Sequence, residues 1–290
     1  MKKFFLLLFL FVNLNAQEYP KGKLGEVVKL GEDILLYTDT NALSKEYVNS
    51  KLQCVNCHRK RKDGRAGTSD KIGTFVGTST AFPAYSKRYD DIISLQNRID
   101  GCFLRCMGGT KSVVNTKVGI AVESYITWLS TGMDVNMSAK APRTPLKIAM
   151  WSKNRKKFKK LFANVTHKNY LNGKKLYETK CASCHGVDGK GVGTFPPLWG
   201  KDKEGHWHSY TADGSMAKLP NGATWIQDNM PLGNPQTLSN NEVVDITLYI
   251  NAQERASYDG FKVEDNFKKM GLKLKEIISP KVNSIFSISH

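Results

Sequence analysis

The feature that most constrains this chain is a short pattern that occurs twice, a cysteine pair followed directly by a histidine. Cys54–His58 and Cys181–His185 both have the form C-x-x-C-H, which is the attachment signature of c-type haem. Two thiols one helical turn apart can bond the two vinyl groups of a single porphyrin, and the next histidine then lies under the iron. A redox-active cysteine pair or half of a zinc site would not explain a histidine after each pair. The sequence therefore predicts two covalently bound haem c groups, attached through Cys54, Cys57, Cys181 and Cys184, with His58 and His185 as proximal iron ligands.

Residues 1–16 have the composition of a secretory signal peptide. Lys2 and Lys3 precede the apolar run 4–12, and the small Ala16 marks the expected cleavage point. This run is too short to span a bilayer, and no later stretch is long and apolar enough to do so. We expect an exported mature chain without a transmembrane segment, located in the periplasm, where bacteria also attach haem to this motif.

The formal net charge of the chain is +17, and Lys2 and Lys3 account for two of these charges. A basic exported protein can bind nucleic acid, anionic lipid, an acidic partner protein or a small anionic substrate. Export argues against nucleic acid and against nuclear localisation, and the chain has no nucleic-acid-binding motif. We therefore expect no nucleic-acid partner.

The two motifs lie 127 positions apart, so that each falls near the start of its own domain. This arrangement predicts an all-α fold of two cytochrome c-like domains, each wrapped around one haem, over residues 17–135 and 166–256. Residues 136–165 are expected to form a basic linker, and residues 257–290 a basic tail without an assigned role. The charge run 153–160 is interpreted either as a solvated segment or as a docking patch for an acidic redox partner.

Apolar spacing predicts helices in both domains. In the first domain we expect helices over 43–52, which leads into the motif, over 89–107 and over 117–129. In the second domain a helix over 172–180 leads into the motif. Residues 239–242 have the sequence of a capping box, which opens a further helix that should cross the first helix of that domain.

The sixth iron ligand decides whether a haem only transfers electrons or also takes part in chemistry. In the second domain Met230 lies 45 residues after His185 and precedes a proline, as the distal methionine of small cytochromes c does. His/Met ligation raises the reduction potential and suits an electron relay. The alternatives to Met230 are Met216 and, more weakly, Lys201, Lys203 and Lys218.

The first domain lacks a comparable methionine. Between His58 and residue 129 the only methionine is Met107, and there is no histidine. Cys102 lies 44 residues after His58, so its position nominates it as a thiolate distal ligand. A disulfide with Cys106 is the alternative, but the two cysteines lie four residues apart on an expected helix, where a bridge would be strained. Cys106 is interpreted as a buried free thiol.

Four segments of the chain follow one another in a characteristic order. They are Gly-Glu-Asp-Ile-Leu-Leu-Tyr-Thr-Asp-Thr at 31–40, the first haem motif, Phe-Pro-Ala-Tyr at 82–85 and Arg-Ile-Asp-Gly-Cys-Phe-Leu-Arg at 98–105. With a second C-x-x-C-H domain behind them, they resemble the di-haem thiosulfate dehydrogenase family, whose members also act as tetrathionate reductases. The resemblance implies His58 and Cys102 as ligands of an active-site haem, and His185 and Met230 as ligands of a second, electron-transferring haem. Cys106 departs from the family pattern.

The resemblance implies thiosulfate and tetrathionate as substrates, interconverted by two-electron formation and cleavage of a sulfur–sulfur bond. A thiolate attacks sulfur readily, which suits Cys102 to this chemistry. The substrates are anions, and on a helix Arg98 and Arg105 share the face of Cys102. We expect Cys102, Arg98 and Arg105 to be catalytic, with Lys87 and Arg88 as weaker candidates. The expected partner is a periplasmic redox protein such as a small cytochrome c, and the enzyme is expected to be a monomer.

Other functions remain open on the sequence alone. A di-haem electron carrier without its own substrate would also need both haems, but it gains little from a thiolate ligand. A Sox-type sulfur cytochrome also uses a cysteine-ligated haem, yet it requires a partner subunit and a carrier protein as substrate. A di-haem peroxidase is disfavoured, because it needs an open position on a haem.

Overall fold

The computed structural model of the chain describes residues 17–61, 63–137 and 145–279, and the expected signal peptide lies outside them. None of the described helices has the length and apolar character needed to cross a bilayer. The α-helices are α1 Gly22–Leu36, α2 Cys54–Cys57, α3 Leu95–Arg105, α4 Lys117–Trp128, α5 Pro145–Phe162, α6 His167–Lys180, α7 Ala182–His185, α8 Leu219–Asn229, α9 Asn240–Asn251, α10 Val263–Lys268 and α11 Leu274–Ile278. The strands are β1 Ala84–Ser86 and β2 Asp91–Ile93, and short 3₁₀ turns lie at η1 Lys45–Tyr47, η2 Ser79–Ala81 and η3 Ser215–Ala217.

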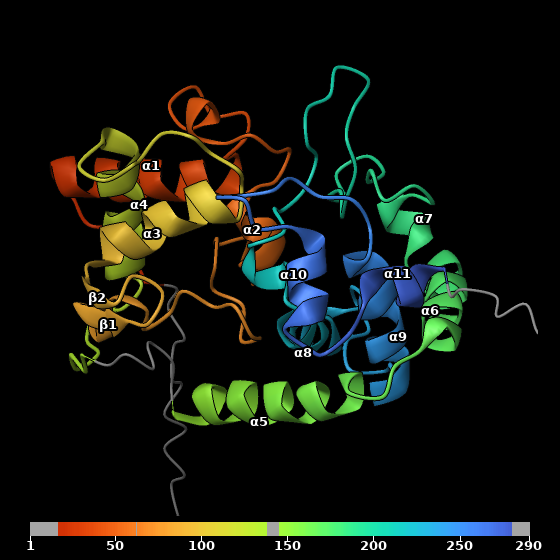
Figure 1. The fold of residues 1–290 in the computed structure, drawn as a ribbon. Helices are drawn as coiled ribbons and strands as arrows, with labels where there is room; N and C mark the ends of the chain where they lie inside the picture. The colour runs from red at the N-terminus through yellow and green to blue at the C-terminus, as the bar shows by residue number, and fades with distance from the viewer. Residues whose placement is uncertain (1–16, 62, 138–144, 280–290) are drawn as a thin grey trace, which may run out of the picture.

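The elements form two halves that lie side by side (Figure 1). The first half consists of α1 to α4 with β1 and β2, and the second half consists of α5 to α11. Each half has its own buried apolar cluster. A smaller cluster joins the halves and is formed by Leu52, Met107, Tyr210 and Ala217. The mostly helical fold agrees with the prediction.

The same helix crossing occurs in both halves. α1 packs against α4 at Gly31, where a Cβ atom would lie 2.0 Å from the carbonyl oxygen of Ala121. α6 packs against α9 at Gly173, where a Cβ atom would lie 1.9 Å from the carbonyl oxygen of Asp245. Glycine is needed at both positions because the two helix backbones touch.

Several predicted elements are present as expected. The helices predicted over 117–129 and 172–180 correspond to α4 and α6. The capping box is also confirmed, because the Ser239 N–H donates to the Glu242 carboxylate at 2.8 Å and the Ser239 hydroxyl accepts from the Glu242 N–H at 3.3 Å. It starts α9, which packs against α6 as predicted.

The helix predicted over 43–52 is wrong, because only η1 is helical there. The side chain of Ser44 is fully buried and donates its hydroxyl hydrogen to the carbonyl oxygen of Thr38 at 2.8 Å. A serine that bonds the backbone in this way holds the chain in a turn instead of a helix. The helix that opens this half is α1, further upstream.

The helix predicted over 89–107 starts later than expected, and the all-α prediction misses a small sheet. Ser94 caps α3 by accepting the N–H of Asn97 at 3.1 Å, so that the helix begins at residue 95. The preceding residues form an antiparallel hairpin of β1 and β2, with Ala84 opposite Ile93. β-Branched residues such as Ile92 and Ile93 favour a strand over a helix.

The predicted linker and tail both contribute to the core of the second half. Within the expected linker 136–165, α5 buries Phe158 and Phe162 completely. These two side chains lie four positions apart on one helix face, while most of the lysines lie on the exposed face. In the expected tail, Phe267 of α10 and Ile277 of α11 are buried in the same cluster. A solvated linker is therefore the wrong description of α5.

This packing can be tested by shortening one side chain of α5. Phe158→Ala removes a fully buried ring and should lower the free energy of unfolding of the second half by about 3–5 kcal/mol. The exposed neighbour provides the control, since Lys159→Ala should change the free energy of unfolding little. Denaturant unfolding followed by circular dichroism measures both variants. Equal stability of the two variants would show that α5 is a separate linker.

Candidate functional site

The first C-x-x-C-H motif forms one helical turn, α2. Two hydrogen bonds stabilise the start of this turn. The Gln53 N–H donates to the side-chain oxygen of Asn56 at 2.7 Å. The N–H of Cys54 donates to the hydroxyl oxygen of the buried Thr38 at 3.0 Å. Since residues three apart share one face of a helical turn, Cys54 and Cys57 present their thiols to the same side.

The histidine of the first motif is oriented by the loop that follows it. Its Nδ1 donates to the carbonyl oxygen of Gly73 at 2.6 Å, and the imidazole stacks on Phe75 with 4.1 Å between ring centroids. A histidine that donates from Nδ1 binds a metal through Nε2. The His58 ring is therefore set up as a proximal ligand.

The second motif is held in the same manner. His185 Nδ1 donates to the carbonyl oxygen of Pro196 at 2.9 Å, and burial lowers the pKa of His185, which favours the neutral, metal-binding form. The Tyr177 hydroxyl donates to the carbonyl oxygen of Gly186 at 2.6 Å, directly after the motif. Two unrelated loops thus fix the two proximal histidines through one backbone carbonyl each.

The residues around the motifs fit haem c. All four motif cysteines are free thiols, and burial raises the pKa of Cys54 and Cys57 to about 12, so that they stay protonated in an apolar setting. Arg255 is 6% exposed, and among the described residues no carboxylate pairs with it and its Nε has no partner. A buried guanidinium without a counter-ion is costly, and a haem propionate is an anion that would satisfy it.

Cys102 lies on α3 beside the first motif, in a strongly polar environment. Its Sγ lies 2.8 Å from Nη1 of Arg98. A hydrogen bond from the Cys106 thiol and the positive charge of Arg98 hold the pKa of Cys102 well below its usual range, although burial opposes this. The same hydrogen bond raises the pKa of Cys106. The opposite directions of the two pKa shifts favour the thiolate at Cys102 over Cys106.

The structure separates the two arginines that the sequence grouped together. The guanidinium of Arg98 contacts Cys102, and the Arg98 side chain is exposed to solvent. Arg105 instead donates from Nη1 to the Tyr89 hydroxyl at 2.5 Å, and its guanidinium lies 4.9 Å from the centroid of that ring. Of the two predicted cations, only Arg98 is brought to the Cys102 sulfur, and a catalytic role of Arg105 stays a prediction.

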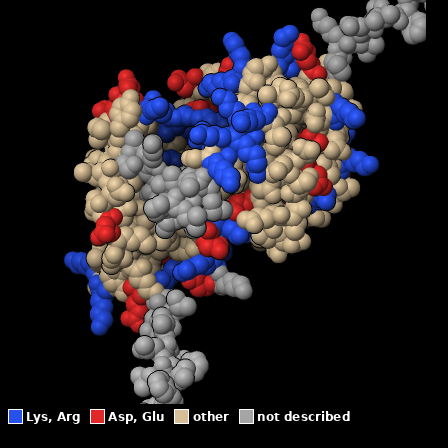
Figure 2. Space-filling model, turned by 90° about the horizontal axis from the view of Figure 1, so that it is seen from below, with Lys and Arg blue, Asp and Glu red and all other residues tan. Residues whose placement is uncertain are grey.

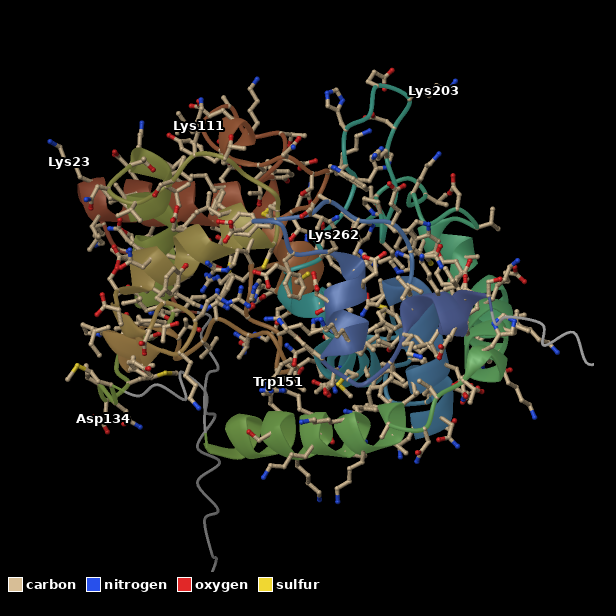
Figure 3. The ribbon with its side chains drawn as sticks, viewed as in Figure 1. Lys23, Lys111, Asp134, Trp151, Lys203 and Lys262 are labelled. Carbon is tan, nitrogen blue, oxygen red and sulfur yellow. The ribbon has the colours of Figure 1, made fainter. Side chains whose placement is uncertain are left out.

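The second half also reaches this site, which the sequence did not indicate. The N–H of Ser215 donates to Cys106, and the partly buried Lys218 lies near the same cysteine. Lys218 lies 4.0 Å from Asp213, which also forms an ion pair with Arg88. Figure 3 shows nitrogen-bearing side chains gathered between α3 and α8. The contacts that Cys106 and Arg88 make with the second half join positions more than 100 residues apart, so that no local pattern could have revealed them.

The candidates for the sixth ligand of the second haem have different surroundings. Met230 directly follows α8 and is half-buried. Met216 packs in the cluster between the halves, and Lys218 faces Asp213. The ammonium of Lys201 lies over the ring of Trp207 and pairs with Glu254 at 3.5 Å, and Lys203 is exposed. Met216, Lys218 and Lys201 are thus engaged elsewhere, which favours Met230.

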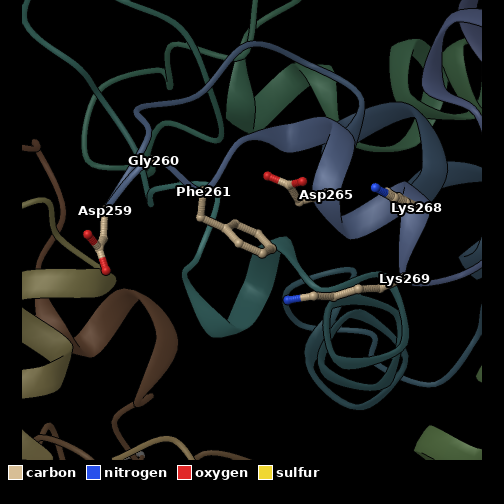
Figure 4. A pocket seen from close by; sticks show the side chains of 6 residues that line it. All are labelled: Asp259, Gly260, Phe261, Asp265, Lys268 and Lys269. Carbon is tan, nitrogen blue, oxygen red and sulfur yellow. The ribbon is translucent and has the colours of Figure 1, made fainter.

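A surface pocket lies at α10. It is lined by Asp259, Gly260, Phe261, Asp265, Lys268 and Lys269 (Figure 4). Among these residues, the ammonium of Lys269 lies over the ring of Phe261, 4.1 Å from its centroid. The pocket contains none of the predicted haem or catalytic residues.

Known proteins resemble the chain over most of its length. The cytochrome c family model matches residues 170–254. A thiosulfate dehydrogenase of Thiomonas intermedia (strain K12) is 33% identical over 242 residues, which cover 81% of this chain and 68% of that protein. The thiosulfate dehydrogenase of Stutzerimonas stutzeri (strain A1501) is 30% identical over 89% of this chain and 77% of its own length. That of Allochromatium vinosum is 30% identical over 80% of this chain and 79% of its own length.

A solved structure is similar in fold. The thiosulfate dehydrogenase (TsdBA) from Marichromatium purpuratum, in its as-isolated form, has a TM-score of 0.65 and 30% identity to this chain. The match covers 84% of this chain and 49% of that one, so this chain spans about half of it. The helical fold and the haem motifs define a c-type cytochrome with covalently bound haem c. Within this class, the chain belongs to the thiosulfate dehydrogenase family.

Haem attachment can be tested at each motif separately. Cys57→Ala should lose covalent attachment at the first motif and Cys184→Ala at the second, because each removes one of two thioether bonds and distorts the turn. Haem staining after denaturing electrophoresis measures the loss against wild type. Ser183→Ala, inside the second motif, is the control and should retain full staining. Staining that both cysteine variants retain in full would contradict the assignment.

Proposed function

We propose that this chain is an exported, periplasmic di-haem c oxidoreductase that interconverts thiosulfate and tetrathionate. His58 and Cys102 would hold the iron of the catalytic haem, and His185 and Met230 that of a second haem that relays electrons. The observation that carries the proposal is the Cys102 sulfur 2.8 Å from Nη1 of Arg98, where the Cys106 thiol and this cation lower the pKa of Cys102. The names of the relatives support thiosulfate as the substrate.

Sulfur chemistry at Cys102 accounts for the reaction in both directions. In reduction, the Cys102 thiolate attacks one of the two central sulfurs of tetrathionate, the central S–S bond breaks, and one thiosulfate leaves. Cys102 then carries the other half as a Cys–S–S–SO₃⁻ adduct, and two electrons release it as a second thiosulfate and restore the thiolate. Oxidation of thiosulfate runs through the same adduct in reverse. When bound, the two haems supply or accept these electrons one at a time.

The charges around Cys102 suit anionic substrates. Arg98 stabilises the Cys102 thiolate. In tetrathionate reduction it also stabilises the negative charge that develops on the sulfur of the departing thiosulfate. Arg88 and Lys218 from opposite halves flank Asp213, which leaves one net positive charge in this group. A dianion is therefore attracted, and the repulsion between two dianions is reduced.

An acidic redox partner such as a small periplasmic cytochrome c fits the exposed face of α5. Figure 2 shows lysine and arginine side chains gathered on the side of the molecule where α5 lies in Figure 1. The exposed cations of α5 are Lys153, Arg155, Lys156, Lys159 and Lys160. Such a surface speeds the encounter with an acidic protein and loses this effect at high salt. The enzyme is proposed to act as a monomer.

Replacement of Cys102 tests the proposed function. Cys102→Ala should abolish both thiosulfate oxidation and tetrathionate reduction while both haems stay attached, because the variant cannot form the adduct. Dye-coupled assays in both directions on the purified protein measure the loss, and haem staining verifies the haem content. Cys106→Ala is the control and should retain most of the activity.

The outcomes of this test separate the competing assignments. An inactive Cys106→Ala with an active Cys102→Ala would mean that Cys106 is the reacting thiol. Normal turnover by both variants would exclude the mechanism and favour an electron carrier without a substrate of its own. An activity that requires a partner subunit would favour a Sox-type cytochrome.

The two arginines give a second test. Arg98→Gln should lower kcat/KM for thiosulfate by about ten- to a hundredfold, the equivalent of one charge-assisted hydrogen bond of about 1.5–3 kcal/mol. Arg105→Gln should have a smaller effect, because Tyr89 already engages its guanidinium. Initial rates over a range of thiosulfate concentrations measure both variants. A larger loss in Arg105→Gln would reverse their roles.

The relay haem can be tested by its potential. Met230→Gly should lower the reduction potential of the second haem, because the thioether ligand that favours the ferrous state is lost. Thiosulfate should still bind to the variant, while electron exit slows. Spectroelectrochemical titration measures the potential, and Met216→Leu is the control. An unchanged potential in Met230→Gly together with a changed one in Met216→Leu would assign the ligand to Met216.

A further inference from the structure

A loop of the second half carries four metal-binding side chains at alternate positions, and none of them has a role in the proposed reaction. They are Asp202, Glu204, His206 and His208. Potential ligand atoms of the first three all lie within 4.8 Å of one another. The loop closes through an isolated bridge between Lys201 and Trp207, and Figure 3 labels Lys203 where it projects from the molecule.

The buried side chain of His208 indicates that this loop binds a ligand. Its side chain is buried, with 6% of the residue exposed, and neither ring nitrogen has a hydrogen-bond partner among the described residues. Its Nε2 faces the carboxylate of Asp202, 3.8 Å from Oδ2. A buried ring without hydrogen bonds costs free energy, which a metal bond would offset.

The distances around Asp202 match those of a metal centre. Its Oδ1 accepts the N–H of His206 at 2.7 Å, which leaves Oδ2 for an ion. Oδ2 lies 3.4 Å from Nδ1 of His206 and 3.8 Å from Nε2 of His208. In a tetrahedral zinc site with bonds of about 2.0–2.1 Å, neighbouring ligand atoms lie roughly 3.3–3.4 Å apart. Small side-chain movements would therefore bring these atoms onto one ion.

We propose that this loop binds one divalent transition metal ion of the zinc class through Asp202, His206 and His208, with Glu204 as the fourth ligand. Two imidazoles with carboxylate oxygens suit zinc better than calcium or magnesium, which take oxygen ligands. Glu204 and His206 are exposed and can close on the ion, whereas His208 is fixed by burial. The two carboxylates neutralise the charge of the ion.

The proposed site lies at the contact between the two halves. Lys51, from the first half, holds its ammonium 3.5 Å from Oδ2 of Asp202, and its N–H donates to the carbonyl oxygen of His208 at 3.1 Å. A metal ion at Oδ2 would displace the ammonium, since both need the same oxygen. Lys51 precedes Cys54 by three residues, so the ion would bind next to the segment that leads into the first haem motif.

Zinc binding to the tag-free holoprotein tests the proposal. After dialysis against a chelator, isothermal titration with Zn²⁺ at neutral pH should show one site per chain. His206→Ala and Asp202→Asn should each weaken this site by at least about tenfold. Asp134→Asn, which removes the same charge from an exposed position of the first half, should not change it. Cys106→Ala should also bind Zn²⁺ normally, which excludes binding at the thiols.

Each result of the titration decides the question. Lys51→Met should tighten the binding, because it removes the competing ammonium. His208→Ala should lose the site, and the exposed His206 provides an equivalent test if that variant does not fold. Absence of Zn²⁺ binding in the wild type, or unchanged binding in Asp202→Asn and His206→Ala, would overturn the proposal. Because none of these residues belongs to the haem or sulfur site, the outcome is independent of the proposed function.

Discussion

The hydrogen bond from His58 to the Gly73 carbonyl orients the histidine that we propose as an iron ligand, and the second half holds the loop that carries Gly73. The neighbouring N–H of Ile72 donates to Asp228 at 2.7 Å, and the indole N–H of Trp225 donates to the carbonyl oxygen of Cys57 at 3.0 Å. Asp228 and Trp225 both lie on α8, which ends directly before Met230. One helix thus supports the proximal histidine of the first haem and leads into the proposed distal ligand of the second. Movement of α8 would affect both iron sites, a coupling that suits electron transfer between them.

The same contact completes the sulfur site. Cys106 receives a hydrogen bond from the backbone of Ser215, and Arg88 forms its ion pair with Asp213, both of which belong to the second half. Buried apolar side chains from both halves surround this region. The first half alone would leave Cys106 and Arg88 without these partners. The second half therefore contacts Cys106 and Arg88 from outside, whereas Cys102 and its partner Arg98 lie together on α3 of the first half.

What the sequence could predict was local chemistry. A haem motif or a capping box depends on residues a few positions apart, and both could be identified from the sequence. The environment of Arg105 could not be predicted in this way. Its partner Tyr89 lies 16 residues earlier, in the hairpin region for which the apolar spacing predicted a helix. In α5 the run of lysines dominated the pattern, although Phe158 and Phe162 have helical spacing. The contribution of Asp213 could not be inferred at all, since it arises only when distant segments dock.

The pairing of Cys102 with Cys106 bears on how one sulfur can serve as both ligand and nucleophile. A thiolate that leaves a metal needs other partners, or its charge is uncompensated in a buried site. Arg98 and Cys106 provide them, one as a cation and the other as a neutral donor. The two donors also lower the basicity of Cys102, and thiolates of low basicity are better leaving groups. In the proposed reaction, the adduct must release Cys102 as a leaving group in every turnover, in either direction. Cys106 therefore supports a step that Arg98 alone already favours, so that its departure from the family pattern is compatible with the same chemistry.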